Sequence, residues 1–136
     1  MRGLLAGCSI VAIGLISLQL GTVGAQEDPV KPAYYTSKVK PILEVNCGNC
    51  HMGTNRKGGL VIDTQEGLKK GGRDGAVIIP GDPANSLFLK LIRHEGPADD
   101  PMPMPPKKPK MSDADIAVIT AWIKGGAVMP PDPPKE

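Results

Sequence analysis

Apolar residues recur at helical spacing in three stretches of the chain. Over 39–43 they fall at i, i+3 and i+4, which predicts a short amphipathic helix that runs directly into Cys47. Over 84–94 they pair at i and i+4, after an Asp-Pro step typical of a helix start. A third apolar stripe over 116–123 follows Ser112 and an acidic first turn. The pattern therefore predicts three helices.

The segments between these helices have the composition of loops. The chain holds 17 glycines and 15 prolines, which is typical of short elements joined by many turns. After the extended run 60–62, Asp63 or Thr64 is expected to cap one or two helical turns. The proline-rich segment 97–110 has no hydrophobic period and is expected to be a rigid, largely extended loop.

The N-terminus has the three-part form of a secretory signal. Arg2 precedes an apolar run, and Val23-Gly24-Ala25 has the small residues of a cleavage site. We expect export to a bacterial periplasm and cleavage after Ala25. The expected division of the chain is a signal peptide over 1–25, a flexible lead over 26–36, one domain over 37–130 and a Pro-rich tail over 131–136.

Two other localisations remain open, and in both the protein would be anchored to a membrane. Leu5-Ala6-Gly7-Cys8 is similar to a lipobox, although it precedes the hydrophobic stretch. The apolar run 4–20 approaches the roughly 18 residues that span a bilayer, so an uncleaved anchor is the second alternative. If the signal is cleaved after Ala25, Cys8 leaves with it and two cysteines remain.

The five residues Cys47-Gly48-Asn49-Cys50-His51 form a C-x-x-C-H motif, the attachment signature of c-type haem. Two thiols three residues apart lie on one side of a helical turn, where each can bond one vinyl group of the porphyrin. The adjacent His51 then supplies a neutral imidazole to the iron. A zinc site at these residues is one alternative, but it would need about four ligands, and His94 is the only other histidine in the chain. A dithiol redox motif is the other alternative, but it usually lies near a βαβ pattern.

Two methionines in the proline-rich loop are candidates for the sixth ligand of the iron. A thioether is a soft, neutral ligand, and pairing it with histidine raises the reduction potential. We expect Met104 to be this ligand, with Met102 as the alternative, and Met111 to pack in the core. His94, expected in the last turn of its helix, is either a second axial imidazole or an ordinary polar group at a helix end.

Composition narrows the remaining function classes. An aromatic content of 3% is thin for a domain that must bury its own core, and a buried porphyrin would supply apolar mass. The formal charge of +2 is too small for a nucleic-acid-binding protein. The sequence has no arrangement of nucleophile and base and no phosphate-binding loop, so we do not expect an enzyme.

The order of motifs over roughly 38–130 resembles the Planctomycete-type cytochrome c domain family. The residues that carry the resemblance are Val39-x-Pro41-Ile42-Leu43, Cys47-x-x-Cys50-His51, Lys57-Gly58-Gly59-Leu60 with Asp63, Gly71-Gly72, Pro80-Gly81-Asp82-Pro83 with Ser86-Leu87, Met104-Pro105-Pro106, Trp122-Ile123 and Gly126-Ala127. The resemblance implies an all-α fold, a small cytochrome c-like domain of about three to five short helices around one covalent haem c, with long Pro/Gly-rich loops. It also implies His51 and Met104 as axial ligands.

These observations predict a mono-haem electron carrier that passes single electrons between redox partners. Arg56 and Lys57, with the lysines of 107–110, would attract a partner with an acidic docking surface, although such side chains are often only a solvated face. Peripheral association with a membrane is a further expected contact. The alternative functions are a haem-based sensor with a weak sixth ligand and an electron-transfer module of a larger oxidoreductase assembly.

Overall fold

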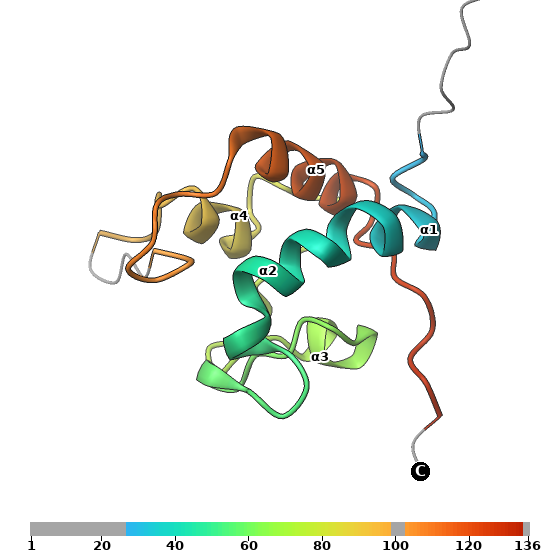
Figure 1. Cartoon of the computed structure of the whole chain (residues 1–136), viewed down its shortest axis with the longest axis horizontal. Coiled ribbons are helices and arrows are strands. Elements are labelled where there is room, and N and C mark those ends of the chain that lie inside the picture. The colour runs from blue at the N-terminus through green and yellow to red at the C-terminus, as the bar shows by residue number, and fades with distance from the viewer. Residues whose placement is uncertain (1–26, 99–102, 135–136) are drawn as a thin grey trace, which may run out of the picture.

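The computed structural model describes residues 27–98 and 103–134, and within these ranges the chain forms helices and loops but no strand (Figure 1). The elements in chain order are α1 (Pro32–Tyr34), the π-helical turn η1 (Tyr35–Val39), α2 (Lys40–His51), the 3-10 turn η2 (Lys57–Gly59), α3 (Gln65–Lys70), α4 (Leu87–Ile92) and α5 (Asp113–Lys124). The all-α class that the resemblance implies is therefore confirmed for the described residues.

Helix α5 supplies the largest fully buried side chain among the described residues, Trp122. Its N-terminus is capped by Ser112, whose hydroxyl accepts a hydrogen bond from the backbone N–H of Asp115 at 3.1 Å. Its buried stripe consists of Ile116, Ile119, Trp122 and Ile123. Both the cap and the stripe agree with the spacing in the sequence.

Helix α2 carries the C-x-x-C-H motif at its C-terminal end. Val39 and Leu43 are buried, as their helical spacing predicts. Pro41 lies in the first turn of α2, where a missing N–H costs little because that group has no partner within the helix. Figure 1 shows α2 running from α1 toward α3, with α5 and α4 on its other side.

The flexible lead expected over 26–36 does not extend to residue 36. Helical structure starts at Pro32, and both Tyr34 and Tyr35 are buried in the core. The Tyr34 hydroxyl donates a hydrogen bond to the carbonyl of Val118 in α5 at 3.4 Å. The folded domain therefore begins before residue 37, because the two tyrosines pack against a helix that is distant in the sequence.

The helix expected over 84–94 is shorter in the structure. Residues 83–86 form turns, and α4 begins only at Leu87. The buried Ser86 hydroxyl donates to the Asp82 carbonyl at 2.8 Å and accepts from the Ile79 N–H at 2.9 Å, which holds this segment in a turn. Helix α4 ends at Ile92 because His94 takes a left-handed conformation with φ of 61°.

The segment expected to be a Pro-rich tail lies against α3. The carboxylate of Asp132 accepts hydrogen bonds from the backbone N–H groups of Gln65 at 2.6 Å and Glu66 at 2.9 Å. The N-cap of α3 is Thr64 and not Asp63, since the Thr64 hydroxyl accepts from the Gly67 N–H at 3.0 Å. The domain therefore continues past residue 130.

Across 27–98 and 103–134, the structure has no helix that is both long and apolar enough to cross a membrane. The predicted signal peptide over 1–25, and Cys8 within it, lie outside the described residues.

Candidate haem site

The last two turns of α2 bring together three of the four predicted haem-binding residues. Cys47 and Cys50 are one helical turn apart, and His51 is the last residue of the helix. Both thiols are free of disulfides, and all three side chains are half-buried. The helix therefore presents two thiols on one side, with an imidazole next to them.

Burial favours the neutral forms of the Cys47 thiol and the His51 imidazole. It raises the pKa of the Cys47 thiol to about 11, with a smaller contribution from Cys50, so Cys47 is protonated at neutral pH. Burial lowers the pKa of His51, against the opposite effect of the nearby carbonyls of Leu60 and Lys57. The imidazole is thus held in its neutral form, which is the form that binds iron.

One ring nitrogen of His51 provides a test of whether this site fits a haem. Nδ1 is buried and has no hydrogen-bond partner among the described residues. A metal-bound histidine usually donates its second ring N–H to a carbonyl or carboxylate. The carbonyls of Leu60 and Lys57 act on this ring without reaching hydrogen-bond geometry at Nδ1. Either carbonyl is a suitable acceptor for the second ring N–H of an iron-bound imidazole, so the residues fit the group.

Met104 is held beside α4 by its backbone. Its N–H donates to the carbonyl of Leu91 at 3.1 Å, and its half-buried side chain packs against the same hydrophobic core as Cys47. Met102 lies outside the described residues. Met111 is buried, which confirms the prediction that it packs. No hydrogen bond joins Met104 to the turn 47–51 within the described part of the chain.

His94 differs from its expected place. It lies beyond the end of α4 rather than in its last turn, and its side chain is exposed. The left-handed conformation at this position turns the chain away from the helix axis. The position is that of a solvated polar group.

No group of three or more His, Cys, Asp or Glu side chains is arranged to hold a metal ion among the residues that the structure describes. The additional ligands that a zinc site at Cys47 and Cys50 would need are not gathered there.

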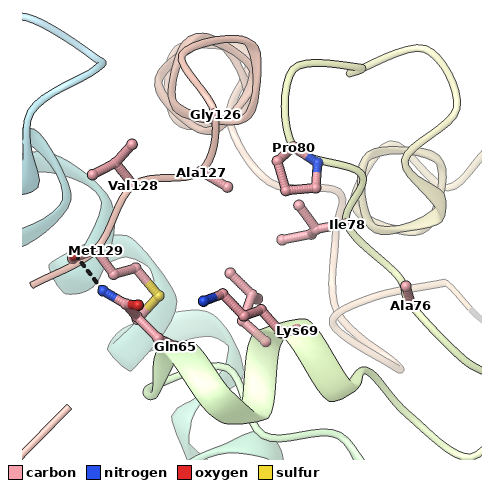
Figure 2. A pocket seen from close by; sticks show the side chains of 10 residues that line it. Gln65, Lys69, Ala76, Ile78, Pro80, Gly126, Ala127, Val128 and Met129 are labelled. Carbon is pink, nitrogen blue, oxygen red and sulfur yellow. Dashed lines mark hydrogen bonds between the residues drawn. The ribbon is translucent and has the colours of Figure 1, made fainter. Parts of the chain in front are cut away.

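A cavity of about 390 Å³ lies elsewhere in the molecule, between α3, the segment 76–80 and the segment 126–129 (Figure 2). Its lining is mostly apolar, with Gln65 and Lys69 as the polar exceptions. None of the four predicted haem-binding residues lines it. This cavity is therefore separate from the candidate haem site.

The sequence did not reveal the backbone groups that support the site. These are the carbonyls of Leu60 and Lys57 near His51 and the carbonyl of Leu91 that holds Met104. Their positions depend on the path of the chain, and the only signal for that path was the pair Gly58-Gly59. Both glycines have positive φ, 64° and 73°, which turns the chain back toward His51.

One comparison with known proteins matches the segment that contains the candidate site. A family model described as Planctomycete cytochrome C matches residues 47–108, a range that begins at Cys47 and includes Met104. No curated protein and no solved structure matches the chain. The matched family implies covalently bound haem c and, in keeping with it, electron transfer. Over residues 47–108, the chain is therefore similar to the Planctomycete cytochrome C family.

Proposed function

We propose that this protein is an exported mono-haem c-type cytochrome that carries single electrons between redox partners. Cys47 and Cys50 hold one haem c through thioether bonds, and His51 and Met104 are its axial ligands. The observation that carries the proposal is the cluster of two free thiols and a neutral imidazole on consecutive turns of α2, at the start of the matched segment.

A haem bound at this site would supply an iron that can be ferrous or ferric. The ligands from the chain, an imidazole and a thioether, are both neutral and remain so in either state. Burial keeps a proton off His51, as its lowered pKa indicates. The backbone bond from Met104 to Leu91 anchors the methionine loop to α4, which favours one geometry in both oxidation states.

The exposed apolar surface also supports a bound porphyrin. Several hydrophobic side chains next to the core remain partly exposed, among them Leu60, Val77 and Met104. They belong to the segment after His51, the segment before α4 and the methionine loop. A porphyrin held at Cys47 and Cys50 would cover apolar surface of this kind, at roughly 25 cal/mol for each Å² removed from water.

Partner contact and location complete the proposal. Lys57, Lys107 and Lys108 are exposed on the two segments that flank the site, and they suit a redox partner with an acidic surface. The signal-like pattern over 1–25 supports a periplasmic location for this exchange.

Expression in a host that can mature c-type haem tests the proposal. The wild-type protein should show a haem-staining band on a denaturing gel and the mass of one haem per chain. The double variant Cys47→Ala, Cys50→Ala should show no band, whereas the matched control Cys8→Ala should stain like the wild type. Wild-type protein purified from such a host with bound zinc and no haem would overturn the proposal.

A further inference from the structure

Asp63 connects the residues before α3 to the turn that follows His51. Its Oδ2 accepts a hydrogen bond from the backbone N–H of Gly53 at 2.9 Å. One residue earlier, the Ile62 N–H donates to the His51 carbonyl at 3.0 Å. Together the two bonds close the loop 52–63, and only the first of them depends on a side chain.

Helix capping does not explain this carboxylate. The N-cap of α3 is Thr64, whose hydroxyl accepts from the Gly67 N–H. The second oxygen of Asp63, Oδ1, is buried without a hydrogen-bond partner among the described residues. A buried acceptor without a partner lowers stability, so we expect this carboxylate to have another role. The partner of Oδ2 indicates that role, because Gly53 lies two residues after His51.

The closed loop determines what lies next to the His51 ring. The carbonyls of Leu60 and Lys57, which act on the imidazole, are both in this loop, and Nδ1 of the ring is buried with no hydrogen-bond partner among the described residues. Gly53 itself has φ of 59°, so its N–H is aimed by a left-handed turn that the bond to Asp63 stabilises. If the loop opened, both carbonyls would move away from the ring.

We propose that Asp63 is a positioning residue for the haem: it holds the loop 52–63 closed and thereby fixes the orientation of the His51 imidazole. The inference rests on the proposed function, because orientation of the ring matters only where His51 is an iron ligand. The hydrogen-bond partner of the second ring nitrogen sets the ring plane and the basicity of a metal-bound histidine.

Electron paramagnetic resonance of the ferric protein tests the proposal, since its g values depend on the orientation of the axial ligands. Asp63→Ala removes the acceptor and should change the g values. Asp63→Asn keeps a side-chain oxygen for the Gly53 N–H and should retain the wild-type values. Asp74→Ala is the matched control, because Asp74 carries the same charge on a side chain that is 86% exposed. It should leave the g values unchanged.

Two results would overturn the proposal. The first is an Asp63→Ala protein that retains covalent haem and the wild-type g values. The second is an Asp63→Asn protein whose g values change as much as those of Asp63→Ala, because the charge and not the hydrogen bond would then be responsible. If Asp63→Ala does not fold, Asp63→Glu replaces it, since its longer side chain displaces the carboxylate. Unchanged g values in that variant would also count against the proposal.

A second measurement separates this proposal from the proposed function. Hydrogen exchange at the Gly53 amide should be faster in Asp63→Ala than in the wild type and equal to the wild type in Asp74→Ala. Haem staining is recorded for every variant. A wild-type protein without haem overturns the proposed function, whereas equal exchange at Gly53 in wild type and Asp63→Ala overturns the role of Asp63.

Discussion

The rings of Tyr35 and Trp122 pack against each other, with their centroids 5.5 Å apart and their planes inclined by 37°. Tyr35 opens the turn η1 that leads into α2, the helix with the C-x-x-C-H motif, and Trp122 lies near the end of α5. The contact therefore joins the N-terminal side of the domain to its C-terminal helix. Trp122 is fully buried, and its indole N–H donates to the Val128 carbonyl at 2.9 Å.

Replacing Trp122 by Phe should destabilise the haem-loaded protein. The change removes apolar volume from the core and the hydrogen bond to Val128, which together should lower the free energy of unfolding by about 2 to 4 kcal/mol. Urea denaturation measures the effect. Val45→Ala is the control, because Val45 is 76% exposed. It should change stability by less than about 0.5 kcal/mol. Equal stability of Trp122→Phe and wild type would contradict the central place given to this residue.

Tyr35 should make stability depend on alkaline pH. Burial, with the charges of Asp63, Glu44 and Asp132, raises its pKa to about 12. The unfolded chain then loses this proton first, so the stabilisation is complete below about pH 10 and declines as the pH rises toward about 12, by at most about 3 kcal/mol. Denaturation at a series of pH values should show this decline in the wild type.

Tyr35→Phe is the matched variant for that series. The Tyr35 hydroxyl is buried and has no hydrogen-bond partner within the described residues, so its removal should not lower stability at neutral pH. The variant should also lack the part of the alkaline decline that comes from Tyr35. An identical pH profile in the wild type and Tyr35→Phe would show that another group is responsible.

The outcome for individual elements shows what local sequence can predict. The cap and stripe of α5 were predicted because both depend on residues within a few positions of each other. The start of α4 was not, because an Asp-Pro step suits a turn as well as a helix N-terminus. Here the hydrogen bond of the buried Ser86 hydroxyl stabilises the turn, and the helix begins only at Leu87.

The boundaries of the domain depended on contacts distant in sequence. Tyr34 and Tyr35 are buried because they meet α5, and Asp132 is ordered because it binds the first N–H groups of α3. Nothing in the local composition of either segment distinguishes it from a flexible terminus. At the site, the motif identified Cys47, Cys50 and His51, whereas the supporting carbonyls are backbone groups that no side-chain pattern reveals.

Export with cleavage after Ala25 is a prediction about the mature protein. Intact-mass analysis of the periplasmic fraction should give a chain that begins at Gln26 and carries one haem. The small residues of Val23-Gly24-Ala25 are the physical reason, since they fit the narrow site of a signal peptidase. A lipid on Cys8, or Met1 retained in a membrane fraction, would show that the protein is anchored instead.

Ligation by Met104 separates an electron carrier from a haem sensor. A ferric haem with a methionine ligand has a weak charge-transfer band in the near infrared. Met104→Ala should abolish that band, lower the reduction potential and open the iron to carbon monoxide, because a neutral thioether stabilises the ferrous state and fills the sixth position. Met102→Ala is the matched control in the same loop and should change little.

The most direct measurement is the visible and near-infrared spectrum of the purified wild-type protein in both oxidation states, recorded with and without carbon monoxide. A mono-haem electron carrier with His51 and Met104 as ligands should show the charge-transfer band when ferric and little reaction with carbon monoxide when ferrous. A ferric protein without that band, whose ferrous form binds carbon monoxide readily, would contradict this function and indicate a ligand-binding haem protein.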